Sequence, residues 1–367
     1  MTSSKERKLL GILALVGLGW AVFVSIYTSI LAQTDPRIQR LMNPTFDWGP
    51  ALTTYDVVSI SPNFTEQWRI SDIFVDPTLS GNSLLALEDS LFFVGSTNQG
   101  DFPALQKLNL QTGQHEWHDQ PIRNFSLLVS GSNQNVIVGH GIPSEITIYD
   151  ARSGDIMVER TFSFRTRGMD FILAEGGELY VNNDYHFYLL DEGNGKTKPF
   201  RNPNKAYPIF LIQNGVIYHR ELGNSLQALD EQTGRMIWGR GFDKEILHQP
   251  MFTEETIFVR TGKSTGQVHV LDRLTGETLW VSEPGVVSNV ATVGDWVYYL
   301  TEEAHLHVAD LQTGMLIDDI VFSPAILDLT NIEQVNSYFY VAATEDMTVV
   351  YFSSSHQLFA FQHIPEE

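Results

Sequence analysis

Short apolar runs alternate with polar, turn-forming residues along most of this chain. Leu91–Val94, Val216–Tyr218 and Trp296–Tyr299 are examples, each rich in β-branched and aromatic residues. Runs of this length between turn formers are typical of β-strands. From about residue 64 onward, the pattern therefore predicts an all-β domain.

Six glycines follow these runs at nearly regular intervals, with successive gaps of 41, 41, 39, 42 and 38 residues. They are Gly113, Gly154, Gly195, Gly234, Gly276 and Gly314. A repeat of this length that contains several short strands is typical of the blades of a β-propeller.

Five of these glycines have an aspartate four residues before them. The aspartates are Asp150, Asp191, Asp230, Asp272 and Asp310. A carboxylate here can accept hydrogen bonds from backbone N–H groups two or three residues on, and glycine adopts the positive φ that closes such a turn. We therefore predict that these aspartates cap turns and are not catalytic acids.

Tryptophan follows three of the glycines at a distance of four residues. These residues are Trp117, Trp238 and Trp280. Their large apolar area predicts that they pack between neighbouring blades.

The repeat predicts a β-propeller of seven four-stranded blades. Six blades contain the repeated glycines, and Thr348–Phe352 with Leu358–Phe361 indicate a seventh that lacks its outer strand. Thr65–Arg69 can supply that strand, which puts Trp68 at the repeat position. Such pairing of the N-terminal strand with the last blade closes the ring and removes an exposed edge. Ser337–Ala343 is predicted to form the innermost strand of this blade.

The unit Asp-x-x-Thr-Gly followed by tryptophan resembles the PQQ-like repeat family. That family includes quinoprotein alcohol dehydrogenases and the BamB-type scaffold of the outer-membrane assembly machinery. The similarity covers about residues 64–364 and is best at Leu226–Trp238 and Val268–Trp280. The resemblance implies the fold but not the activity.

The enzymes of that family hold a quinone beneath a ring formed by adjacent cysteines and use a calcium or lanthanide ion with a catalytic aspartate. This chain has no cysteine and is shorter than those enzymes. We therefore expect no quinone cofactor, and the non-enzymatic, BamB-like branch is the closer resemblance.

The first 32 residues differ from the rest of the chain. Leu9–Ala32 contains 24 residues without a charge, and Lys5, Arg7 and Lys8 precede it. This run is long enough to cross a bilayer as one transmembrane helix, and the basic residues predict a cytoplasmic tail at 1–8. The predicted location is the plasma (inner) membrane with the propeller outside; the alternative is cleavage near Ala32 and secretion.

Residues 33–62 contain four prolines and few apolar runs, so they are predicted to be a linker. The prolines also oppose an eighth blade in this segment. The predicted propeller then spans residues 63–367.

Composition excludes several functions. The formal net charge of −21 repels phosphate backbones, so nucleic-acid binding is not expected. The absence of cysteine removes disulfides, thiolate nucleophiles and cysteine-based metal sites.

Three further segments resemble reactive motifs. Gly262–Gly266 has the letters of a hydrolase nucleophile turn, but it lies between two predicted strands, so a hairpin is favoured. Asp191–Gly195 suggests a calcium loop but lacks the closing glutamate. His305 and His307 share one face of a strand, with no third ligand at a defined spacing. No catalytic, cofactor or metal residue is assigned.

The sequence favours a membrane-anchored binding or scaffolding module whose partner is another membrane or envelope protein. The alternative is a channel-mouth enzyme, a glycan-active hydrolase or lyase that uses paired carboxylates. A sensor that signals through the single helix is a third hypothesis, weakened by the short predicted tail.

Overall fold

The computed structural model describes most of the predicted propeller, and the residues it describes belong to one compact unit. They are residues 54–75, 84–97, 103–118, 126–130, 135–140, 145–161, 170–173, 179–183, 186–191, 193–200, 209–221, 223–246, 249–262, 265–323 and 339–364. The predicted transmembrane helix at 9–32 and most of the predicted linker lie outside them. Within these ranges, no helix has the length and apolar character needed to span a membrane.

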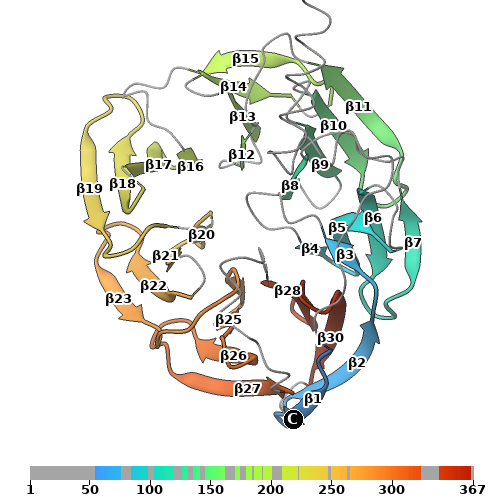
Figure 1. The fold of residues 1–367 in the computed structure, drawn as a ribbon. Helices are drawn as coiled ribbons and strands as arrows, with labels where there is room; N and C mark the ends of the chain where they lie inside the picture. Colours follow the sequence, from blue (N-terminus) through green and yellow to red (C-terminus); the bar gives the residue numbers. More distant parts are fainter. Residues whose placement is uncertain are drawn as a thin grey trace, which may run out of the picture. The chain divides into compact units, whose positions relative to one another are not determined.

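Seven antiparallel sheets follow one another in sequence order around the ring in Figure 1. Blade one contains β3 (Phe74–Val75), β4 (Leu84–Leu87), β5 (Ser90–Ser96), β6 (Ala104–Asn109) and β7 (His115–His118). Blade two contains β8 (Ser126–Ser130), β9 (Asn135–His140), β10 (Glu145–Asp150) and β11 (Ile156–Thr161). Blade three contains β12 (Asp170–Leu173), β13 (Leu179–Asn183), β14 (His186–Leu190) and β15 (Thr197–Phe200).

The other four blades have the same strand order from the centre outward. They contain β16 (Ile209–Gln213), β17 (Val216–Glu221), β18 (Ser225–Asp230) and β19 (Met236–Gly241); β20 (Met251–Phe252), β21 (Thr256–Thr261), β22 (Gln267–Asp272) and β23 (Thr278–Val281); β24 (Ala291–Val293), β25 (Trp296–Leu300), β26 (His305–Asp310), β27 (Leu316–Phe322) and β1 (Val57–Ile60); and β28 (Phe339–Ala343), β29 (Met347–Phe352), β30 (Gln357–His363) and β2 (Phe64–Ile70).

The core is divided among the seven interfaces between neighbouring blades. Seven clusters of buried apolar residues each join two adjacent sheets. Every residue of β29 is buried because Val349 and Tyr351 pack toward blade one while Val350 and Phe352 pack toward blade six. The sequence of such a strand is mostly apolar because its successive side chains enter two different interfaces.

Ring closure follows the prediction. β2 pairs with β30 in antiparallel register, with Phe64 opposite His363 and Arg69 opposite Phe359. β28 is the innermost strand of the same sheet, also as predicted. The seventh blade is therefore assembled from both ends of the described chain, and the all-β, seven-bladed fold is confirmed.

Two blades depart from the expected four strands. In blade one, β3 and β4 both pair with β5. In blade six, β1 adds to the outer edge of β27, with Val57 opposite Phe322 and Ile60 opposite Ile320. β1 lies inside the segment that was expected to be a linker. Val57 and its neighbours form a β-branched run that favours a strand, but the prolines around this run favoured the linker prediction.

Tyr55 fixes the start of this extra strand. Its side chain is fully buried and stacks on Phe352, with ring centroids 4.2 Å apart. The Tyr55 backbone N–H donates to Gln357 Oε1 at 2.7 Å, and Gln357 Nε2 donates to the Tyr55 carbonyl at 3.2 Å. The segment before β2 is therefore part of the fold, and Tyr55 packs in the apolar cluster that joins blade six to blade seven.

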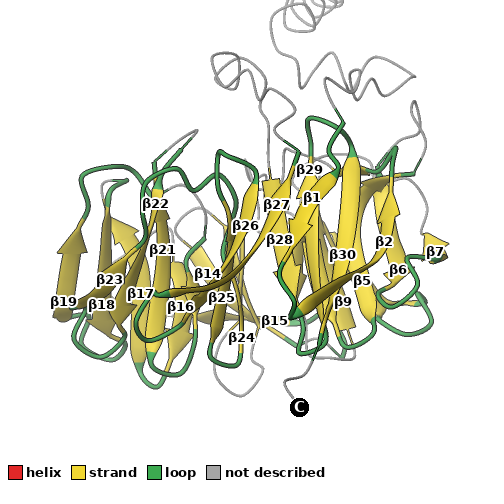
Figure 2. Ribbon diagram, turned by 90° about the horizontal axis from the view of Figure 1, so that it is seen from below, coloured by secondary structure: helices red, strands yellow, loops and turns green. Residues whose placement is uncertain are grey.

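The antiparallel order places the connections at two ends of the blades. In each sheet the first hairpin lies at one end, here called the turn face, and in blades one to six the hairpin that contains the repeat glycine lies at the same end. The second hairpin and the crossover to the next blade lie at the other end. Figure 2 shows the strands running between these two ends.

We predict that a chain beginning at residue 63 is less stable than one beginning at residue 54. Loss of buried Tyr55 alone should lower the free energy of unfolding by about 3–5 kcal/mol, the usual cost of deleting a large buried aromatic side chain. Urea unfolding followed by tryptophan fluorescence measures the difference. A Tyr55→Phe variant of the longer chain is the control and should keep most of the stability; equal stability of the two chains would contradict this role of the segment.

Candidate functional site

The predicted repeat residues lie together in the turns of the turn face. Asp272 Oδ1 accepts hydrogen bonds from the Thr275 backbone N–H at 2.7 Å and from the Thr275 hydroxyl at 2.8 Å. These bonds, the hydroxyl bond first, lower the pKa of Asp272. Asp230 and Asp310 accept the corresponding bonds from Thr233 and Thr313, which likewise lower their pKa values.

The other two aspartates have the same kind of partner. Asp150 accepts from the backbone N–H of Ser153 at 2.7 Å, and this bond lowers the pKa of the carboxyl. Asp191 accepts from the Gly193 N–H at 2.9 Å. All five carboxylates therefore serve as hydrogen-bond acceptors within their own turns.

Each repeat tryptophan lies over the turn glycine of the next blade. A Cβ added to Gly276, whose φ is +71°, would lie 2.5 Å from Trp238. The other three pairs are Trp68 on Gly113, Trp117 on Gly154 and Trp280 on Gly314. Only glycine leaves room for the indole at this φ, so the two repeat positions form one interlock between blades.

Three of the four indole nitrogens add a hydrogen bond to this interlock, and the buried Trp117 Nε1 has no partner among the described residues. Trp68 Nε1 donates to the Leu110 carbonyl at 2.8 Å, and Trp280 Nε1 donates to the Leu311 carbonyl at 2.8 Å. Trp238 Nε1 donates to the Arg273 carbonyl at 3.2 Å. In each case the acceptor follows the capping residue of the next blade's turn.

Blade six has Asp318 at the position that tryptophan occupies in blades one, four, five and seven. Blade seven is closed by β2, so it has no Asp-x-x-Thr-Gly hairpin on which an indole could pack. Asp318 instead accepts hydrogen bonds from Asn63 Nδ2 at 2.8 Å and from the Ser61 hydroxyl. Blades two and three also lack the tryptophan and have Val158 and Pro199 at this position.

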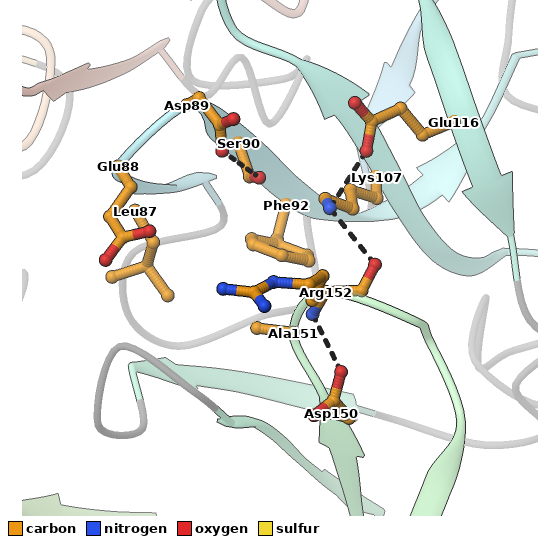
Figure 3. Close-up of a pocket in the computed structure, with 10 residues that line it drawn as sticks. All are labelled: Leu87, Glu88, Asp89, Ser90, Phe92, Lys107, Glu116, Asp150, Ala151 and Arg152. Carbon is orange, nitrogen blue, oxygen red and sulfur yellow. Dashed lines mark hydrogen bonds and ion pairs between the residues drawn. The ribbon is translucent and has the colours of Figure 1, made fainter.

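A pocket of about 630 Å³ opens on the turn face between blades one and two (Figure 3). Lys107 lies at its inner end, with a side chain only 7% exposed, and its ammonium group is 2.8 Å from Glu116. The hydrogen bond from Lys107 is the main cause of a lowered pKa at Glu116. Lys107 and Glu116 therefore neutralise each other within the pocket.

The repeat explains why space remains here. Ala151 follows the capping Asp150, and the residue at the equivalent position between blades four and five is the buried Arg273. Arg273 donates to Gln213 Oε1 at 2.7 Å and to the Thr253 carbonyl at 2.8 Å. Ala151 has only a methyl group where Arg273 has a guanidinium group, so the space between blades one and two stays open as a pocket.

Most of the exposed large apolar side chains among the described residues lie on or beside the outer strands of blades four to six. We call this group the apolar band; Leu274 is 81% exposed and Met315 is 70% exposed. Its members are Met236, Ile237, Leu274, Leu279, Val281, Met315, Leu316 and Ile317. β19, β23 and β27 carry most of them and follow one another along the rim in Figure 1. Exposed apolar side chains that gather on neighbouring strands are a candidate site of protein interaction.

Sequence analysis did not identify this band. Part of its signal was present, because two apolar residues stand two and three positions after the turn glycine in blades four and six, as they also do in blade two outside the band. In a strand with one face buried, one of two adjacent side chains should be polar. Consecutive apolar residues on an outer strand therefore indicated exposed apolar surface.

The remaining motifs show no reactive arrangement. Gly262 and Gly266 flank a hairpin in which Thr261 pairs with Gln267, as predicted. His305 Nδ1 lies 3.4 Å from an Asp319 carboxylate oxygen, and burial is the main cause of a lowered pKa at His307. No group of three or more potential metal ligands is found among the described residues.

Comparisons with known proteins agree with this architecture. Residues 204–366 match a family model described as "Outer membrane protein assembly factor BamB". The chain is also similar to the crystal structure of BamB from Moraxella catarrhalis, with a TM-score of 0.50 and 13% sequence identity over 82% of this chain and 99% of that one. At this identity the likeness concerns the fold alone. No curated protein matches the chain.

The interlock of tryptophan and glycine gives a stability test. Gly276→Ala should cost about 1–2 kcal/mol for its positive φ and about 1–3 kcal/mol more for the collision with Trp238. Gly215→Ala is the matched control, because its φ is +73° and nothing lies within 4 Å of an added Cβ. Urea unfolding should show the larger loss for Gly276→Ala; equal losses would mean that the indole contact contributes nothing.

Proposed function

We propose that this chain, which is a β-propeller of the PQQ-like repeat family, is a membrane-anchored scaffold that binds another protein of the cell envelope through its outer strands. The BamB-like family match supports a protein-binding role in the envelope. The proposed location of the binding surface rests on one observation, the apolar band.

The band has the properties that partner docking requires. Six of its eight side chains lie on three successive outer strands, each held by antiparallel pairing to the strand behind it. A rigid support lowers the entropy lost on binding, and burial of exposed apolar side chains supplies the driving force. Hydrophobic anchors at the centre of such a patch usually carry most of the binding energy.

The anchor is proposed from the sequence. Residues 9–32 are uncharged and follow a basic segment, which favours one transmembrane helix with the propeller outside the plasma membrane. The strong negative charge of the chain would repel anionic headgroups and leave the propeller surface free for protein partners.

The anchor predicts the form of the protein in native membranes. The purified protein should have the mass of the full chain, 41.4 kDa, and should remain in the membrane pellet after an alkaline wash. Intact-mass spectrometry of the pellet and supernatant measures both properties. Recovery of a soluble form that begins near residue 33 would show that the segment is a cleaved signal and not an anchor.

The band predicts which substitutions release the partner. In the full-length protein, solubilised from native membranes in mild detergent, Leu279→Ser with Leu316→Ser should abolish a stoichiometric membrane partner detected by mass spectrometry. The reason is that hydroxyl groups replace apolar anchors that would be desolvated in the complex. A photo-crosslinking residue at position 279 should also label that partner in the otherwise unaltered protein.

Blade two provides the matched control. Ile156 and Met157 are exposed to a similar degree on β11, on another part of the rim. Ile156→Ser with Met157→Ser should retain the partner. Loss of the partner in both double variants, or in neither, would remove the apolar band as the docking surface.

A further inference from the structure

We infer that the outer edge of β19 accepts an extended, acidic segment of a partner protein as an additional β-strand. This inference rests on the protein-binding function proposed above, and it adds the place and the chemistry of one contact.

The propeller already contains one strand added in this way. β1 pairs with the outer edge of β27, outside the repeat that builds the other blades. The pairing covers residues 320–322 of β27, and no other described strand lies on the outer edge of any of the remaining blades. The outer strand of this scaffold can therefore receive an extended segment without rearrangement of the blade behind it.

Three of the other outer edges carry features that oppose strand addition and that β19 lacks. Pro199 in the middle of β15 lacks the N–H that a ladder requires and is a common protection of edge strands. In β2, Arg69 forms ion pairs with Glu66 and Asp56. β23 is shorter, with four residues, and exposed Glu277 and Glu283 flank it.

Two glycines leave the backbone of β19 accessible. Gly239 and Gly241 are both exposed, and nothing lies within 4 Å of a Cβ added to Gly241. The bulge in this strand is at residues 236–238, so it does not account for either glycine. Glycine inside a strand often marks a place where another backbone approaches closely.

The side chains around this edge define the partner's chemistry. Arg235 and Arg240 are exposed, and no acidic residue lies between them, although the whole chain has a net charge of −21. The next charged residues are Asp243, Lys244 and Glu245, whose formal charges nearly cancel. Met236 and Ile237, 60% and 51% exposed, provide apolar contact beside the arginines. A strand with acidic residues alternating with β-branched residues would match this surface.

The test uses the full-length protein in detergent and a phage-displayed library of random peptides about twelve residues long. We expect selection to enrich acidic, β-branched peptides. A synthetic copy of the most enriched peptide should slow amide hydrogen exchange in residues 236–241. Arg235→Glu with Arg240→Glu should weaken its binding at least about tenfold, because both attractive charges become repulsive.

Lys196→Glu, one residue before β15, with Lys198→Glu on β15 is the matched control, since it makes the same change in net charge on the neighbouring blade. This variant should bind the peptide as the unaltered protein does. Enrichment of non-acidic peptides, protection outside β19, or equal weakening by both pairs of substitutions would overturn the inference. The Leu279 and Leu316 variants report separately on the scaffold proposal, so either idea can fail while the other stands.

Discussion

The structure depends on burial of both faces of every blade against its neighbours. No sheet has an apolar interior of its own, and each of the seven buried clusters is shared by two adjacent blades. An open ring would leave apolar faces exposed at both ends, at a cost of roughly 25 cal/mol per Å² of apolar surface. Closure by β2 and by the Tyr55 segment is therefore a condition for the stability of every blade.

The same constraint explains where the repeat is strict and where it varies. Glycine recurs in the turn that receives a side chain from the preceding blade, and that side chain is tryptophan at four of these contacts and Val158 at Gly195. The outer strands have an edge and a surface that no neighbouring blade covers. Sequence variation there does not weaken the ring, so features such as the apolar band and the bare backbone of β19 can serve binding.

Much of the fold could be predicted because it follows from local chemistry and spacing. Gly276 and Asp272 indicate a turn by their own conformational and hydrogen-bonding preferences, and the period of the glycines gives the number of blades. β1 was missed because its few residues lie among prolines, and its pairing partner β27 is more than 250 residues away in sequence. The pocket beside Lys107 was also missed, because its existence depends on Ala151 from another blade.

The all-β class, the seven blades, the capped turns and the closing strand are predictable from the amino-acid sequence, because each depends on residue type at a short or regular spacing. Which side chains remain exposed and which distant segments meet depends on the packing of the folded chain. Leu279 and Val270 are both apolar residues of blade five, yet only Val270 is buried, because β22 is covered by the next blade and the outer face of β23 is not. Exposure is a property of neighbours in space, and one-dimensional patterns do not contain it.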